Sequence, residues 1–160
     1  MRRRNPHVLL AKFLGSKGEE IMYRLLCASV CLYASVFVVA CGTQKDLAAA
    51  DIAVARFHQL LDSQHYVTVY EQASPKFRDA TKQEQFVALM TAVHKKLGHV
   101  DNAARKGFFV NYNISGSQIR VNYATKFSEG DAEEEFLWTK NGDNLALLGY
   151  HISSNALITK

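Results

Sequence analysis

The histidines that follow Cys41 have no partner at the spacing that metal binding or catalysis requires. They are His58, His65, His94, His99 and His151. No H-E-x-x-H or H-x-H pattern joins them, and all three cysteines lie at or before position 41. Zinc takes three or four such ligands, which this sequence would have to gather from distant elements. The sequence therefore predicts no metal site and no cofactor.

The acidic run Glu133-Glu134-Glu135 could suggest a pair of catalytic carboxylates. Strand alternation would send Glu133 and Glu135 to one face and Glu134 to the other, and no feature of the sequence would push their pKa values apart. We expect a solvated strand edge here, and solvated or helix-edge positions for His58 and His94. No acid occupies an obviously inward strand position, and no G-x-S-x-G elbow or glycine-rich phosphate loop is present. The sequence predicts no catalytic residue.

The aromatic residues are the set that most favours a ligand-binding pocket. Thirteen Phe, Tyr or Trp residues follow Cys41. Tyrosine and tryptophan combine an apolar body with a polar group, as pockets for small ligands require. Five residues on predicted strands could line a concave face and form our candidate pocket: Tyr112, Tyr123, Trp138, Tyr150 and His151. The alternative is that they belong to the hydrophobic core.

The net charge of +4 arises entirely before Cys41. Six basic and two acidic residues precede Cys41, whereas the residues after it include thirteen of each sign. A neutral domain offers no electrostatic footprint for nucleic acid. We expect no nucleic-acid partner.

Residues 1–40 have the character of an export signal. Residues 25–40 carry no charge and follow Arg24, which gives an apolar core behind a basic segment. A spanning helix needs about 20 apolar residues, more than these sixteen, so we favour an export signal. A transmembrane anchor is the alternative. We infer that translation starts at Met22, which would leave a compact leader; a long but functional basic segment is the other possibility.

The leader ends at Val38-Val39-Ala40-Cys41, which resembles the bacterial lipobox. That resemblance implies cleavage before Cys41 and a diacylglycerol on its thiol. The acyl chains would then hold the protein at a membrane. Gly42 in place of Asp after the cysteine implies the outer membrane, with the protein facing the periplasm. Residues 41–46 would then be the lipidated cysteine and a short tether, and residues 47–157 a single domain.

Helical periodicity dominates the first half of this domain. Apolar spacing predicts amphipathic helices over residues 46–62 and 66–73, the second broken by Ser74-Pro75. Thr81-Lys82-Gln83-Glu84 is a capping box, which predicts that a third helix starts there. Gly98 supplies the left-handed cap at its end.

The apolar period changes to two after Gly107. Alternation predicts four strands over residues 108–114, 119–127, 132–140 and 145–152, with a hairpin turn at Asn141-Gly142. Helices followed by sequential antiparallel strands make an α+β fold with the helices packed on one face of a curled meander. This order resembles the cystatin-like and nuclear-transport-factor-2-like cone folds, whose sheet wraps around a long helix and often leaves a pocket at its open end.

Five segments resemble a group of small uncharacterised bacterial lipoproteins: Leu60-Leu61-Asp62, Ala73 to Arg78, Phe86 to Leu97, Gly149 to Ile152 and Asn155-Ala156-Leu157. That group has no established activity, so the resemblance implies a fold and a location only. We expect a noncatalytic lipoprotein of the cell envelope that binds a small apolar ligand or an envelope protein. The alternative is a small enzyme that uses Tyr and His in its cone pocket, which fold analogy alone supports.

Overall fold

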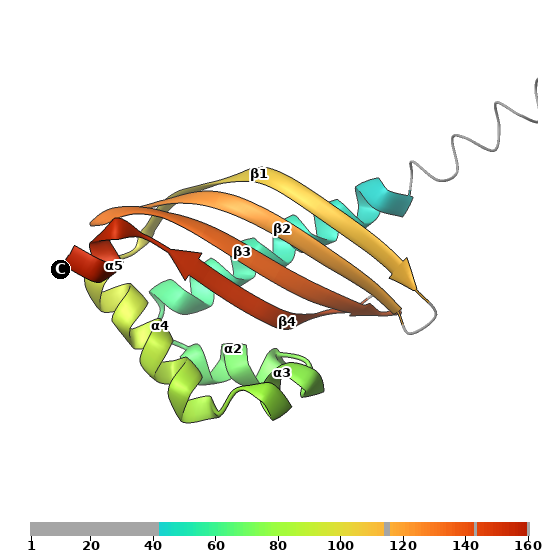
Figure 1. The fold of residues 1–160 in the computed structure, drawn as a ribbon, viewed down its shortest axis with the longest axis horizontal. Helices are drawn as coiled ribbons and strands as arrows, with labels where there is room; N and C mark the ends of the chain where they lie inside the picture. The colour runs from blue at the N-terminus through green and yellow to red at the C-terminus, as the bar shows by residue number, and fades with distance from the viewer. Residues whose placement is uncertain (1–41, 114–115, 143, 160) are drawn as a thin grey trace, which may run out of the picture. The chain divides into compact units, whose positions relative to one another are not determined.

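The structure is a computed structural model that describes residues 42–113, 116–142 and 144–159. Cys41 and the predicted export signal lie outside the described residues. Gln44–Lys160 form one compact unit, in which helices precede a four-stranded sheet (Figure 1). The α+β class is therefore as predicted. No helix in the described ranges is both long and apolar enough to span a bilayer.

The N-terminal helix covers residues 42–62 of the described chain and begins earlier than predicted. Its buried face consists of Leu47, Ala50, Val54, Phe57 and Leu61, as the helical period predicts. Asp46 of this helix is also buried, and its carboxylate lies 2.5 Å from Lys140 Nζ and accepts from Tyr112 OH at 3.1 Å. These contacts join Asp46 to the sheet.

Two short helices follow. α2 (Tyr66–Gln72) confirms the second predicted helix, and α3 (Pro75–Ala80) was not foreseen by the periodicity. Ser74 caps α3, since its Oγ accepts from the Phe77 N–H at 3.2 Å. Pro75 suits the first helical position, where no N–H is needed. This proline therefore begins a helix as well as ending one.

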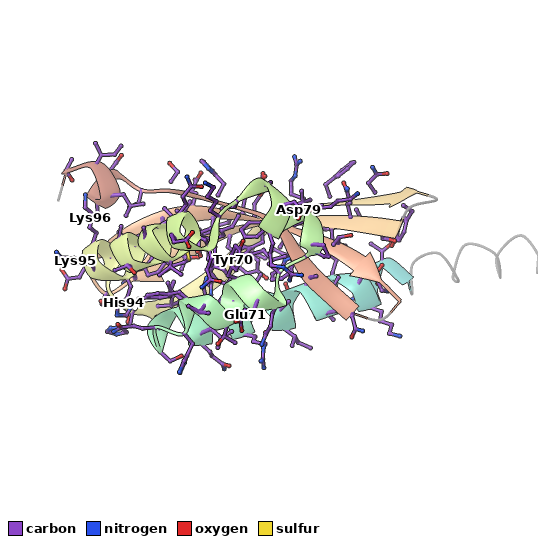
Figure 2. All side chains as sticks on the ribbon, turned by 90° about the horizontal axis from the view of Figure 1, so that it is seen from below. Tyr70, Glu71, Asp79, His94, Lys95 and Lys96 are labelled. Atoms are coloured by element: carbon purple, nitrogen blue, oxygen red, sulfur yellow. The ribbon has the colours of Figure 1, made fainter. Side chains whose placement is uncertain are left out.

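α4 (Gln83–Leu97) starts at a different cap from the predicted one. Lys82 is the N-cap and makes no side-chain hydrogen bond, so the capping-box prediction is wrong. Thr81 instead ends α3, and its carbonyl accepts from Tyr70 OH at 2.8 Å. Tyr70 projects into the interior (Figure 2), where its ring meets that of Phe86 on α4. Gly98 ends α4 at the predicted position, but its φ of 79° and ψ of −153° lie outside the left-handed helical region that was predicted.

The sheet contains four antiparallel strands in sequence order, among the described residues. They are β1 (Val100–Asn113), β2 (Gly116–Phe127), β3 (Gly130–Asn141) and β4 (Asn144–Ser153), and the short α5 (Asn155–Thr159) follows. β1 begins well before the predicted residue 108. Register shifts between Val100 and Asn102 and between Arg105 and Gly107 break the alternation that would have indicated it.

One face of the sheet is packed against the helices (Figure 1). Alternate residues of the central strands are buried on that face: Ile119, Val121, Tyr123, Thr125 and Phe127 of β2, and Ala132, Glu134, Phe136 and Trp138 of β3. The intervening residues of β2, such as Arg120 and Asn122, are exposed on the other face. The sites described below all lie between the helices and the buried face.

Candidate functional site

A buried carboxylate lies at the centre of the interface between helix and sheet. The Glu134 side chain on β3 is 0% exposed. Its Oε2 lies 2.8 Å from His58 Nε2 and also accepts from the Thr125 hydroxyl, while its Oε1 accepts from Tyr150 OH at 2.7 Å. A buried carboxylate is costly unless it is hydrogen-bonded and paired. Three donors, from the N-terminal helix, β2 and β4, meet that condition.

The predictions of a solvated Glu134 and a solvated His58 are wrong. Both residues are buried, and Glu134 is an acid at an inward strand position. The alternation itself was predicted correctly, because Glu134 faces away from Glu133 and Glu135. A signal was present in the sequence: Glu134 shares its strand face with the apolar Phe136, two residues away.

Tyr150 is held as a neutral donor within this cluster. Burial is the main reason that its pKa lies well above the ordinary value of 10.0, and the charge and hydrogen bond of Glu134 raise it further. Its ring packs against those of Phe57 and Phe136, at centroid distances of 4.8 and 5.1 Å. The phenol therefore stays protonated and donates a hydrogen bond to Glu134.

A polar groove lies between the N-terminal helix and the start of β1, with His58 among its lining residues. Asp51 in this groove accepts from Arg105 Nη1 at 2.8 Å and from Tyr123 OH at 2.5 Å. Burial first, and then the bond to Asp51, raise the Tyr123 pKa. Asp62 accepts from the Val100 N–H at 3.0 Å. These groove residues thus bond to one another, and the described ranges hold no cluster of three metal-ligating side chains.

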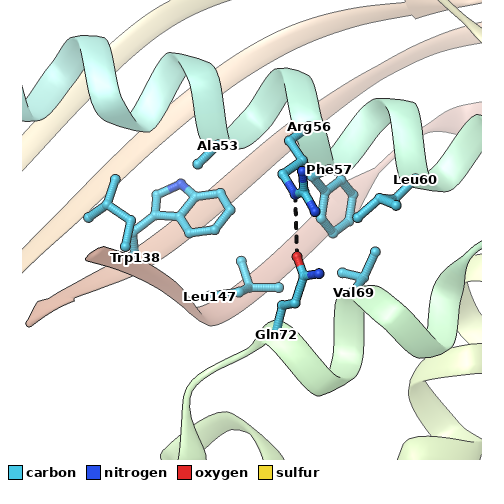
Figure 3. A pocket seen from close by; sticks show the side chains of 9 residues that line it. Ala53, Arg56, Phe57, Leu60, Val69, Gln72, Trp138 and Leu147 are labelled. Carbon is cyan, nitrogen blue, oxygen red and sulfur yellow. Dashed lines mark hydrogen bonds between the residues drawn. The ribbon is translucent and has the colours of Figure 1, made fainter. Parts of the chain in front are cut away.

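An apolar hollow of about 90 Å³ lies on the opposite flank of the N-terminal helix, against α2, β3 and β4 (Figure 3). It is lined by Ala53, Arg56, Phe57, Leu60, Val69, Gln72, Trp138, Leu145 and Leu147. Trp138 is 6% exposed, and its Nε1 is buried without a hydrogen-bond partner. Arg56 Nε donates to Gln72 Oε1 at 3.3 Å across the hollow.

The structure distributes the five predicted pocket residues over several places. Trp138 lines the hollow, Tyr123 lines the groove, and Tyr150 belongs to the buried cluster. Tyr112 is 55% exposed and reaches the N-terminal helix through its bond to Asp46. His151 is exposed. The hollow also uses helix residues such as Arg56 and Gln72, which carry no local sequence signal of a site.

The fold and these sites define a small α+β domain in which helices cover one face of a four-stranded antiparallel sheet. Residues 53–150 match the model of a family described as a protein of unknown function, DUF4019. Because this span is more than half of the 160 residues, the chain belongs to that family. The matched region includes His58, Glu134, Trp138 and Tyr150. No curated protein matches the chain.

Proposed function

We propose that this chain is a lipid-anchored protein of the bacterial cell envelope whose domain binds a small ligand without transforming it. The observation that carries the binding role is the apolar hollow beside the unpartnered Trp138 Nε1. Apolar walls with a few placed polar groups are the usual form of a small-ligand site.

The state of the buried cluster supports a noncatalytic role. Both oxygens of Glu134 accept hydrogen bonds, and its side chain is inaccessible to solvent. A carboxylate that acts on a substrate must come within hydrogen-bond reach of it. Glu134 instead ties the N-terminal helix to the sheet through His58. The long helix along the inner face of a curled sheet is also the basis on which we propose a relation to the cystatin-like and nuclear-transport-factor-2-like folds.

Binding in the hollow is tested by the emission of Trp138, the single tryptophan of the chain. A small-molecule screen should find compounds that change this emission saturably. Ala53→Leu, which fills the hollow, should abolish the change, whereas Ala48→Leu on an exposed position of the same helix should preserve it. The binding role is refuted if no compound gives a change that depends on Ala53.

One observation favours the alternative of a small enzyme. His58 lines the groove and is paired with a carboxylate, an arrangement that orients and stabilises a histidine acting as a general base. Diethyl pyrocarbonate, which modifies accessible histidines, separates the two roles. For a noncatalytic domain we expect His58 to react far more slowly than His99, whose side chain is 65% exposed. Rapid modification of His58 in the folded protein would favour the enzyme.

The proposed location rests on the lipobox at Val38-Val39-Ala40-Cys41. We expect Cys41→Ser to abolish labelling by a fatty-acid analogue and to leave the leader uncleaved. Cys27→Ser, within the leader, is the matched control and should be labelled normally. Fractionation should place the labelled protein in the outer membrane. Undiminished labelling of Cys41→Ser would refute the lipid anchor.

A further inference from the structure

Aromatic side chains gather on the first strand of the sheet. β1 is hydrogen-bonded to β2 alone among the described strands, so it forms one edge of the sheet. Phe108, Phe109 and Tyr112 on this strand are 53%, 62% and 55% exposed. A cluster of large exposed apolar side chains indicates a surface that meets a protein or a membrane. We call these three residues the aromatic edge.

The directions of these side chains restrict the surface that they fit. Phe108 lies opposite the buried Val121 and Phe109 lies opposite the exposed Arg120, so the two rings project from opposite faces of β1. A flat surface contacts both rings only if it lies along the edge of the strand. The backbone groups at that edge need polar partners, which water and lipid headgroups supply and the hydrocarbon interior does not. A flat surface that the rings enter only to a shallow depth meets both conditions.

The aromatic edge lies beside the start of the N-terminal helix. Tyr112 OH donates to the Asp46 carboxylate at 3.1 Å, and Figure 1 shows the end of β1 and the start of this helix at the same end of the domain. Asp46 follows Cys41, the proposed lipidation site, by five residues. Even a fully extended chain of five residues spans no more than about 18 Å. Acyl chains on Cys41 would therefore keep Tyr112 near the surface of the bilayer.

We infer that the aromatic edge docks on the lipid surface in which Cys41 is anchored, with the open edge of β1 toward the bilayer. Tyrosine favours the interface between membrane and water, and phenylalanine rings gain by burial among the headgroups and upper acyl chains. The residues after Cys41 carry thirteen charges of each sign, so the attraction is apolar rather than electrostatic. This inference rests on the proposed lipid anchor and adds the orientation of the domain.

Lipid contact is measured with a fluorophore on a single introduced thiol. The proposed processing removes Cys27 and Cys31 and acylates Cys41, so an introduced cysteine is the only free thiol of the lipidated protein. Asn111→Cys carries the fluorophore at an exposed position of β1 without loss of an aromatic ring. Gln85→Cys, exposed on α4, is the control reporter. Each lipidated protein is reconstituted in vesicles of phosphatidylethanolamine and phosphatidylglycerol that contain a lipid with a nitroxide near its headgroup.

We expect the nitroxide to quench the fluorophore on Asn111→Cys and to leave the one on Gln85→Cys nearly unaffected. Added Phe108→Ser should lower the ratio of docked to undocked protein roughly tenfold, since half-burial of a phenylalanine ring contributes about 1.4 kcal/mol. Leu89→Ser, which removes an exposed apolar side chain from α4, is the matched control and should leave the quenching as it is. Added salt should also change the quenching little, because the attraction is apolar.

The outcomes separate the docking from the lipid anchor. If mass spectrometry finds acyl chains on Cys41 and the two reporters are quenched equally, the docking is overturned and the anchor stands. Quenching that Phe108→Ser leaves unchanged would also overturn the docking. A reporter signal on Asn111→Cys that follows the density of protein in the vesicle, and not the nitroxide, would assign the aromatic edge to a second copy of the chain. Absence of acyl chains on Cys41 would overturn both proposals.

Discussion

Replacing Glu134 with leucine removes the acceptor that the buried cluster shares. Leucine is close to glutamate in size and keeps the position filled, so the main change is the loss of the carboxylate. His58 Nε2, the Thr125 hydroxyl and Tyr150 OH then remain buried without the acceptor they now have. Glu134→Leu should therefore destabilise the fold far more than its change in hydrophobicity would suggest.

The expected loss follows from the number of donors left behind. Each buried donor without a partner costs about 1–3 kcal/mol, so the three donors together cost about 3–9 kcal/mol. Burial of the leucine side chain offsets about 1.5–3 kcal/mol of the sum. We expect a net loss of about 3–5 kcal/mol from the free energy of unfolding, a large share of the about 5–15 kcal/mol typical of a domain.

Urea unfolding, followed by far-ultraviolet circular dichroism, measures this loss by linear extrapolation. Glu133→Leu is the matched control, since the neighbouring Glu133 is exposed on the other face, and its effect should stay within about 0.5 kcal/mol. Thr125→Val removes one donor and should cost about 1 kcal/mol. The double variant Thr125→Val/Glu134→Leu should lose less free energy of unfolding than the sum of the two single losses, because it has no Thr125 hydroxyl left without an acceptor.

The reasoning is refuted if Glu134→Leu costs less than about 1 kcal/mol, or no more than Glu133→Leu. Strict additivity with Thr125→Val would equally contradict a shared network. Either result would mean that Glu134 does not organise His58, Thr125 and Tyr150 in the folded protein.

Three further changes have definite expected results. The Tyr150 pKa is raised in the folded state, so its contribution to stability is complete below pH 10 and is lost at about 1.4 kcal/mol per pH unit as the pH rises further. Urea unfolding should therefore show that the free energy of unfolding falls less steeply between pH 10 and 11.5 in Tyr150→Phe than in the unmodified protein, by that amount. Gly98→Ala should cost at least about 2 kcal/mol, because φ is 79° and the new methyl group would overlap Ser128 Oγ. Gly142→Ala, with φ 63° and open space around it, should cost about 1 kcal/mol. Equal losses in urea unfolding would contradict the clash. Phe57→Ala should cost about 3–5 kcal/mol in thermal or urea unfolding, because Phe57 is 3% exposed, and a loss under 1 kcal/mol would exclude it from the core.

The sequence by itself determined the order and type of most elements. The apolar stripe from Leu47 to Leu61 and the alternation from Ile119 to Phe127 arise because one face of each element is buried. The period of the apolar residues can be recognised within each segment of the sequence, without knowledge of its partner. The α+β class follows from that order alone. Where the alternation is broken, as at the bulges of β1, the pattern loses the strand, which is why its first eight residues were missed.

Only the tertiary structure decided what the polar residues do. Glu134 becomes a buried acceptor because His58 lies opposite it, although 76 positions separate the two along the chain. Thr81 ends α3 rather than beginning α4, since its N–H donates to the Phe77 carbonyl at 2.9 Å, and its own carbonyl accepts from Tyr70 OH. The hollow likewise exists only where Arg56, Gln72 and Trp138 meet. The type of a residue determines which hydrogen bonds its side chain is able to make, and the fold determines which partners lie within reach.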